Sequence, residues 1–266
     1  MTVPHAVHER IVDALARAVR EEAVTIVFAC ESGSRAWGFA SADSDYDVRF
    51  IYLHPRDWYL CVDVEKKPEV IERPIEEHLD LSGWDLRKAL RLLRKSNPPL
   101  LEWLNSPQVY IQDVPVVTRL RNLIPTCYSP RACWHHYFHM AEGNFREYLR
   151  GDVVWLKKYL YVLRPLLAVR WIERDLGIVP MEFDALLAKA IDAPELARSI
   201  RELVARKRAG EELDRGARIP PISHFIESEL ERLKQIALPS GESAKGAEGL
   251  NEVFRWALET RGRSMT

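Results

Sequence analysis

The sequence predicts an α+β protein, in which an N-terminal mixed sheet with flanking helices is followed by an all-α C-terminal region. The first half alternates apolar runs of strand length with helical periodicities, whereas helical patterns alone follow from about Tyr128. The chain has 266 residues, of which 47% are hydrophobic, and this is enough for two domains. We therefore expect a domain with a mixed sheet over residues 1–125 and a helical domain over residues 126–266.

The first half contains one predicted helix, a buried strand and a second strand in close succession. Residues 5–21 place Ile11 and Leu15 at helical spacing, and the apolar run AVTIVFAC over residues 23–30 is typical of a buried strand. In DYDVRFIYL alternate residues point to opposite faces, so Asp45 and Asp47 share one face with Arg49. Two short strands, near residues 69–72 and 75–81, are expected before a helix in GWDLRKALRLLRKS.

The second half begins with Ser129-Pro130, a pair typical of a helix N-cap followed by the first helical position. Further on, Pro165 is expected to kink a helix because it lacks an N–H group. Other helical patterns cover residues 181–191, 194–208, 221–237 and 248–261, separated by the breaks GARIPP and LPSGESAKG.

Composition and termini narrow the class of protein. The formal net charge is −1, which gives no overall indication of a polyanion-binding protein. The four cysteines contain no CxxC pair, and the first residues lack the apolar run of a signal peptide. No apolar stretch reaches the roughly 20 residues that span a bilayer. We expect a cytoplasmic protein with reduced thiols that is not embedded in a membrane.

The pair of acids in SGSRAWGFASADSDYDVRF predicts a metal site. Two carboxylates on one strand face raise the cost of ionising each other unless a cation lies between them. Mg²⁺ binds hard oxygen ligands, and Asp45 and Asp47 would supply two of them. Just upstream, Gly33-Ser34 is a small-residue turn at which the backbone, a hydroxyl and the start of a short helix would approach a phosphate.

This combination of a buried strand, Gly-Ser and a later Asp-x-Asp resembles the DNA polymerase β nucleotidyltransferase superfamily. The longer string ESGSRAWGFASADSDYDVRFIY, with GWDLRKALRLLRKSNPPLLEWLNSP and KKYLYVLRPLLAVRWI, is similar to its YcgL-type, RNA-ligase-associated (RlaP) branch. The resemblance covers about residues 25–175. It implies a polymerase-β-like sheet that carries three metal-binding carboxylates, the third on a later strand.

The third carboxylate is assigned by this resemblance to Asp80, which lies between Leu79 and Leu81 as the family's acid lies between apolar residues. Glu77 is the reserve candidate. Asp85 is expected instead to act in the first turn of the next helix, where its charge complements the helix dipole.

The resemblance implies transfer of a nucleoside monophosphate from a nucleoside triphosphate (NTP), ATP among them, to an acceptor hydroxyl, with Mg²⁺ or Mn²⁺ as cofactor. Asp45, Asp47 and Asp80 would be the catalytic metal ligands. Gly33 and Ser34 would hold the β- and γ-phosphates. Further nucleotide-binding residues would be Arg35, Ser44 and, from the family-like KKYLYVLRP motif, Lys157, Tyr161 and Arg164.

The acceptor is left open by the sequence. RNA is one acceptor, favoured by the family's association with RNA ligation and by the segment from Arg119 to Arg170, which has nine basic and three acidic residues interleaved with aromatics. A small molecule or a protein hydroxyl would suit the same centre. Two other functions stay open: a nucleotide- or RNA-binding module without catalysis, and a protein-modifying nucleotidyltransferase of a toxin–antitoxin system.

The segment CYSPRACWHHYFH offers a different metal site, because it contains Cys127, Cys133 and three histidines. Its cysteine spacing is unusual for structural zinc, and a helix that starts at Ser129-Pro130 separates the two thiols. Helix packing is therefore the favoured interpretation of this segment.

Overall fold

The computed structural model describes residues 3–211, 213–236 and 248–262. It consists of two compact units. The first holds the described residues up to Ala36, residues 45–128 and the described residues after Ser243; the second holds residues 37–44 and 129–242. The sequence assigned all of residues 126–266 to a helical domain. The structure instead groups helix α12 (Glu248–Arg261) with the first unit, and the loop before Asp45 with the second.

The first unit is built on a mixed five-stranded sheet with the order β3-β4-β2-β1-β5. Strands β1 and β2 are antiparallel, as are β1 and β5 and also β3 and β4, whereas β2 and β4 are parallel. The predicted α+β class is confirmed. The strands are β1 (Thr25–Glu31), β2 (Tyr46–Leu53), β3 (Val70–Glu72), β4 (Leu79–Asp85) and β5 (Val109–Gln112).

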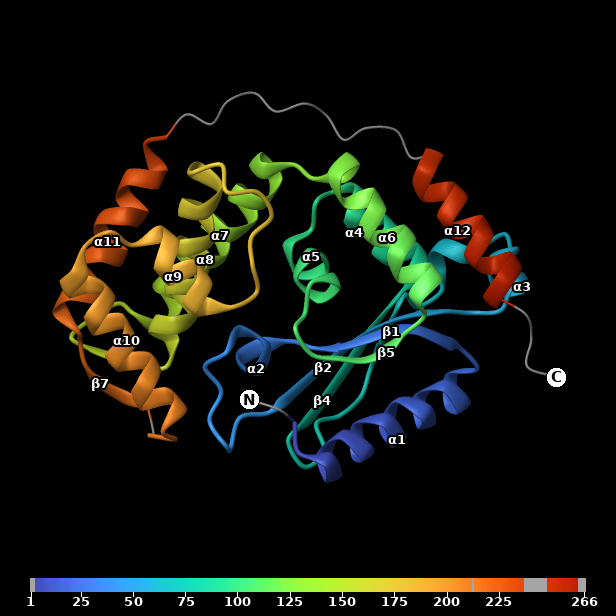
Figure 1. The fold of residues 1–266 in the computed structure, drawn as a ribbon, viewed down its shortest axis with the longest axis horizontal. Coiled ribbons are helices and arrows are strands. Elements are labelled where there is room, and N and C mark those ends of the chain that lie inside the picture. The colour runs from blue at the N-terminus through green and yellow to red at the C-terminus, as the bar shows by residue number, and fades with distance from the viewer. Residues whose placement is uncertain (1–2, 212, 237–247, 263–266) are drawn as a thin grey trace. The chain divides into compact units, whose positions relative to one another are not determined.

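Side-chain alternation decides which face of this sheet carries the core and which carries the acids. Helix α1 (His5–Glu22) buries Ile11 and Leu15 in a cluster with Val48, Phe50 and Tyr52 of β2. Asp47 and Arg49 alternate with these residues and so belong to the opposite face. Figure 1 shows α1 below the sheet, with α4 (Leu86–Arg94), α5 (Pro98–Leu104) and α6 (Val114–Cys127) above it.

Helices α4, α5 and α6 each begin after a short polar side chain that accepts a main-chain N–H group. The N-cap Asp85 accepts the main-chain N–H of Arg87 at 2.8 Å and the hydroxyl hydrogen bond of Tyr59, at the end of α3 (Arg56–Tyr59), at 2.6 Å. Burial raises the pKa of Asp85 to about 6. Asp85 therefore serves the start of a helix, as its sequence context indicates. A 3-10 turn, η1 (Val64–Lys66), lies between α3 and β3.

Among its described residues, the second unit is helical apart from one pair of three-residue strands that the sequence did not predict, β6 (Val153–Trp155) and β7 (Arg215–Ala217). The side chain of Ser129 accepts the N–H of Ala132, with Pro130 at the first helical position, so the predicted cap is confirmed. The helices are α7 (Pro130–Tyr148), α8 (Lys158–Glu173), α9 (Phe183–Ala190), α10 (Pro194–Arg208) and α11 (Pro220–Lys234).

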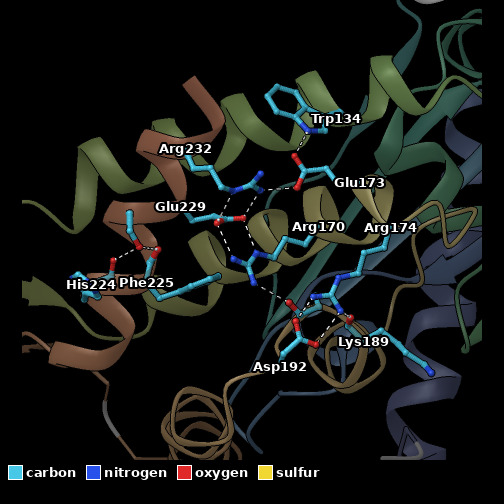
Figure 2. Close-up of polar contacts among 12 residues, drawn as sticks. Trp134, Arg170, Glu173, Arg174, Lys189, Asp192, His224, Phe225, Glu229 and Arg232 are labelled. Carbon is cyan, nitrogen blue, oxygen red and sulfur yellow. Dashed lines mark hydrogen bonds and ion pairs between the residues drawn. The ribbon is translucent and has the colours of Figure 1, made fainter. Parts of the chain in front are cut away.

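A buried ion cluster joins helices α8 and α11 within this unit. Figure 2 shows Glu229 between Arg170, whose two contacts are 2.7 and 2.9 Å long, and Arg232. Arg232 also reaches Glu173, which accepts the indole N–H of Trp134. Burial alone would raise the pKa of Glu229, but the hydrogen bonds from Arg170 and Arg232 outweigh it and lower that pKa to about 2.

Among the residues that the structure describes, no helix combines the length and the apolar character needed to cross a membrane.

Candidate active site

The predicted acids meet at the end of the sheet where β1 finishes and β2 and β4 begin. Strands β2 and β4 are parallel, and in their register Asp47 lies directly beside Asp80. Neighbouring strands are about 4.8 Å apart, so the two side chains project next to each other from one face. The structure thus brings together Asp47 and Asp80, and it places the reserve candidate Glu77 elsewhere, in an exposed turn where it pairs with Arg10.

Arg49 bridges these two carboxylates. One terminal nitrogen, Nη2, lies 2.7 Å from Oδ2 of Asp80 and 3.1 Å from Oδ1 of Asp47. The other, Nη1, donates to the main-chain oxygens of Val48 at 3.1 Å and Asp80 at 3.0 Å. The side chain is 18% exposed. The period of two on β2 places Arg49 on the face of Asp47, but its bridging contact depends on the register with β4.

Asp45 lies one residue before β2 and is exposed. Its Oδ1 is 3.1 Å from Nδ1 of His78, which belongs to the turn that leads into β4. In this turn Glu77 and His78 both have positive φ, +44° and +67°. A non-glycine residue in this region carries strain of order 1–3 kcal/mol, and such strain gathers at functional sites. No local sequence pattern indicates this turn or the His78 contact.

Gly33, two residues after the end of β1, lies against the carboxylate of Asp47. Its φ is +55°, and a Cβ atom there would lie 1.9 Å from Oδ2 of Asp47. Any side chain would therefore collide with the carboxylate. The glycine that the sequence assigned to phosphate binding also makes room for a predicted metal ligand.

Two further residues that the sequence analysis did not identify, Glu31 and Tyr110, hold the backbone at Asp47 in place. Glu31, the last residue of β1, is buried and its Oε1 accepts the main-chain N–H of Asp47 at 2.8 Å. Its other oxygen accepts a hydrogen bond from the hydroxyl of Tyr110 on β5. The apolar run of β1 gives no sign of a buried acid at its end, and Tyr110 is too distant in sequence to be linked to it by any local pattern.

The electrostatics of the site disfavour the ionised forms of Asp47 and Glu31. Burial raises the pKa of Asp47; the Arg49 guanidinium lowers it, whereas Asp80 and Asp45 raise it further. Burial also raises the pKa of Glu31 to about 7, against the lowering effect of its hydrogen bonds with Tyr110 and the Asp47 N–H. Such shifts are typical of sites that work on charged ligands.

The predicted phosphate-side residues lie around the start of helix α2 (Gly33–Trp37) and the following loop. Ser34 is buried at 8% exposure. Arg35 donates to the main-chain oxygen of Asp45 at 3.1 Å and lies 3.8 Å from the ring centre of Tyr46. The hydroxyl of Ser44 contacts both the backbone N–H and the hydroxyl of Ser41, at 3.0 and 3.1 Å. These contacts shape the loop, and nucleotide binding by these residues stays a prediction.

The three predicted residues of the KKYLYVLRP motif differ in exposure: Lys157 is exposed, Tyr161 is half-buried and Arg164 is buried. Lys157 precedes helix α8 and lies above the ring of Trp155. Arg164 is only 2% exposed; its guanidinium lies 4.6 Å from the ring centre of Trp37 and donates to the oxygen of Met181 at 3.2 Å. Arg164 is held inside the unit because the middle of α8 is buried on all sides.

Tyr161 belongs to the same cluster. Its ring lies 5.8 Å from that of Trp37 in an edge-to-face arrangement, and Lys158 lies 4.9 Å from its centre. Tyr161 and Arg164 therefore hold Trp37 within the helical unit. Contact of Lys157 or Tyr161 with a nucleotide stays a prediction.

Within residues 3–211, 213–236 and 248–262, no group of three His, Cys, Asp or Glu side chains is arranged to hold a metal ion. At the histidine-rich start of α7, Cys133 is buried within the helix, whereas Cys127 is the last residue of α6. Asp45, Asp47 and Asp80 nevertheless fit a divalent cation by their donor chemistry: all offer hard oxygens, and a cationic guanidinium already lies between two of them.

Comparison with known proteins identifies the family of this chain. The family model described as RlaP, RNA repair pathway DNA polymerase beta family, matches residues 7–256. The Bacillus subtilis (strain 168) protein named "Uncharacterized protein YcgL" is 51% identical over 229 residues, which cover 86% of this chain and 87% of that protein.

A solved structure, the nucleotidyltransferase-like protein from Exiguobacterium sibiricum 255-15, is 12% identical and matches with a TM-score of 0.32 over 93% of this chain and 90% of that one. A TM-score this low does not by itself establish a shared fold.

The fold and the paired acids define a nucleotidyltransferase-like sheet of the DNA polymerase β type. The chain belongs to the RlaP family of RNA repair pathway DNA polymerase beta proteins. Membership of this family supports nucleotidyl transfer as the general class of reaction.

Proposed function

We propose that the protein is a Mg²⁺-dependent nucleotidyltransferase that transfers a nucleoside monophosphate from an NTP to a hydroxyl group of RNA. The observation that carries this proposal is the register that sets Asp47 beside Asp80, with Asp45 two residues away along the chain. The RNA acceptor is supported by the family description, which refers to an RNA repair pathway.

In the proposed reaction an acceptor hydroxyl oxygen attacks the α-phosphorus of the NTP. A new P–O bond forms, the bond from the α-phosphorus to the bridging oxygen breaks, and pyrophosphate leaves while the hydroxyl proton is lost to solvent. Divalent cations, when bound, would lower the pKa of the hydroxyl and offset the charge of the leaving pyrophosphate. Asp45, Asp47 and Asp80 would hold these cations.

The other residues of the site would orient these groups. Glu31 and Tyr110 fix the backbone at Asp47, and Gly33 leaves space beside its carboxylate. We propose that Ser34, Arg35 and Ser44 contact the triphosphate, and that Lys157 and Tyr161 contact the nucleotide. For Arg164 we propose an indirect role through Trp37, because its burial does not favour direct contact.

The test is a transfer assay with each α-labelled NTP, Mg²⁺ or Mn²⁺, and total RNA or a protein extract. Label in RNA from one or more NTPs is expected. Asp47→Asn should lower the rate by about 10³-fold or more, because bound cations supply several kcal/mol to the transition state. Asp43→Asn, an exposed acid of the preceding loop, is the matched control and should retain the rate.

Three outcomes would contradict the proposal in different ways. Label in protein would replace RNA by a protein acceptor. Absence of label in every fraction, with a folded protein, would leave a binding module. Full activity of a cooperatively melting Asp47→Asn variant would remove the metal-ligand role of Asp47.

A further inference from the structure

The contacts of Arg49 place a positive charge where the proposed metal site needs one. Nη2 is within hydrogen-bond distance of both Asp47 and Asp80, and the 18% exposure of the side chain limits screening by water. Three acids and one guanidinium give Asp45, Asp47, Asp80 and Arg49 a joint formal charge of about −2. The protein therefore neutralises part of its own acid cluster.

Arg49 is also anchored where it stands. Nη1 donates to the main-chain oxygens of Val48 and Asp80, two groups of the sheet itself. If the two carboxylates turned toward a divalent cation, these main-chain bonds would keep the guanidinium close to that cation. Close together and partly buried, the two positive charges repel strongly.

We propose that Arg49 is a tethered counter-cation that opposes binding of a free divalent cation until the triphosphate of the nucleotide adds its negative charge. The inference rests on the proposed metal site and goes beyond it. It makes the binding of metal and of nucleotide mutually reinforcing, because each reduces the charge penalty of the other. The site would then stay closed to free divalent cations and bind them together with the nucleotide.

The experiment measures binding of Mn²⁺ alone, without nucleotide, from the electron paramagnetic resonance signal of the unbound ion. The wild-type protein is compared with Arg49→Gln, Arg49→Lys and the control Arg73→Gln. Arg73 is a partly exposed arginine of the same unit that pairs with Glu21 and Glu22, both at 2.8 Å, away from the acids. Asp47→Asn in the Arg49→Gln background shows whether the ion binds at this site.

Arg49→Gln is expected to bind Mn²⁺ about 5- to 150-fold more tightly than the wild type, the usual range of coupling between charged sites. Arg49→Lys, which keeps the charge, and Arg73→Gln should stay close to the wild type. Without metal, Arg49→Gln should melt at a lower temperature, and Mn²⁺ should raise its melting temperature more than it raises that of the wild type.

Equal or weaker Mn²⁺ binding by Arg49→Gln would overturn the inference. If that variant does not fold, Mn²⁺ binding by the wild-type protein still tests the inference. Stoichiometric binding of micromolar Mn²⁺ by the wild type without nucleotide would also overturn it. The two proposals fail separately. Tighter Mn²⁺ binding by Arg49→Gln without any nucleotidyl transfer removes the proposed function only, whereas active transfer with unchanged Mn²⁺ binding removes the role of Arg49 only.

Discussion

At the residue scale, the position of the Asp47 carboxylate depends on the absence of a side chain at Gly33. An added methyl group would occupy the position of the Asp47 carboxylate, and the positive φ of Gly33 is costly for any L-residue. We predict that Gly33→Ala destabilises the protein by about 1–2 kcal/mol and lowers nucleotidyl transfer at least ~100-fold. Urea unfolding and the labelled-NTP assay measure the two effects.

The matched control for this substitution is Gly143→Ala. Gly143 lies in helix α7, and a methyl group added at its Cα would meet no heavy atom within 4 Å outside the neighbouring helix backbone. Alanine should therefore stabilise the helix by up to about 1 kcal/mol without changing transfer. Retention of transfer by Gly33→Ala would show that Asp47 does not need its observed position.

Residues of the site differ in how far the sequence predicts them. Asp45 and Asp47 follow from strand alternation and charge repulsion, and both are local signals. Arg49 shares their face by the same alternation, but its role depends on Asp80, which is 31 positions away in the chain. Glu31 and Tyr110 depend on strand pairing alone. Local sequence patterns therefore predict the acids. The residues that orient the acids cannot be predicted in this way, because their contacts join distant parts of the chain.

At the scale of elements, the turn from Glu76 to Leu79 connects strain with the site. Glu77 and His78 have φ values that glycine would adopt without cost, and the His78 side chain contacts Asp45. We predict that Glu77→Gly and His78→Gly each raise the free energy of unfolding by about 0.5–1 kcal/mol, the strain relieved less the entropy cost of glycine. Urea titration measures this gain.

The two variants should separate in metal binding. His78→Gly removes the partner of Asp45 and, with the nucleotide present, should weaken Mn²⁺ binding about tenfold, as loss of a group that orients a ligand commonly does. Glu77→Gly keeps His78 and is the control. Equal Mn²⁺ affinity in both variants would show that His78 does not contribute to metal binding. The positive φ values would then serve only the conformation of the turn.

Elements with strong local signals were predicted well. The N-cap at Ser129, the helix start at Asp85 and the apolar run of β1 each depend on a few neighbouring residues. The strands β6 and β7 were missed because three residues are too short for a periodicity, and their pairing joins segments about 60 residues apart. The burial of Arg164 was not predicted, because spacing alone does not reveal which side of a helix meets solvent.

At the scale of the whole molecule, the response to acid should depend on the ion cluster around Glu229. The pKa of Glu229 in the folded protein, about 2, lies below its ordinary value of 4.5. Its contribution to stability is therefore present above about pH 4.5 and is lost as the pH falls toward 2. We predict a loss of up to about 3 kcal/mol over this range.

Urea titrations at several pH values, in which the unfolding of the helical unit is followed, measure this decrease in the free energy of unfolding. Glu229→Gln should be less stable by about 3 kcal/mol at neutral pH and should lose the acid-dependent decrease. Glu231→Gln, an exposed acid on the same helix, should behave as the wild type. An unchanged decrease in Glu229→Gln would assign it to other carboxylates.

The parallel pairing of β2 and β4 divides the chain into segments that tolerate length changes and one that does not. The crossover between these strands, residues 54–78, closes a loop whose entropy changes only slowly with its length, so insertions near its exposed residues should be absorbed. One residue inserted at the start of β4 would instead turn Asp80 toward the face of helix α1 and deprive Asp47 of its neighbour. In the natural variation of this family, lengths should therefore vary within the crossover, whereas the count from the start of β4 to its acid should not.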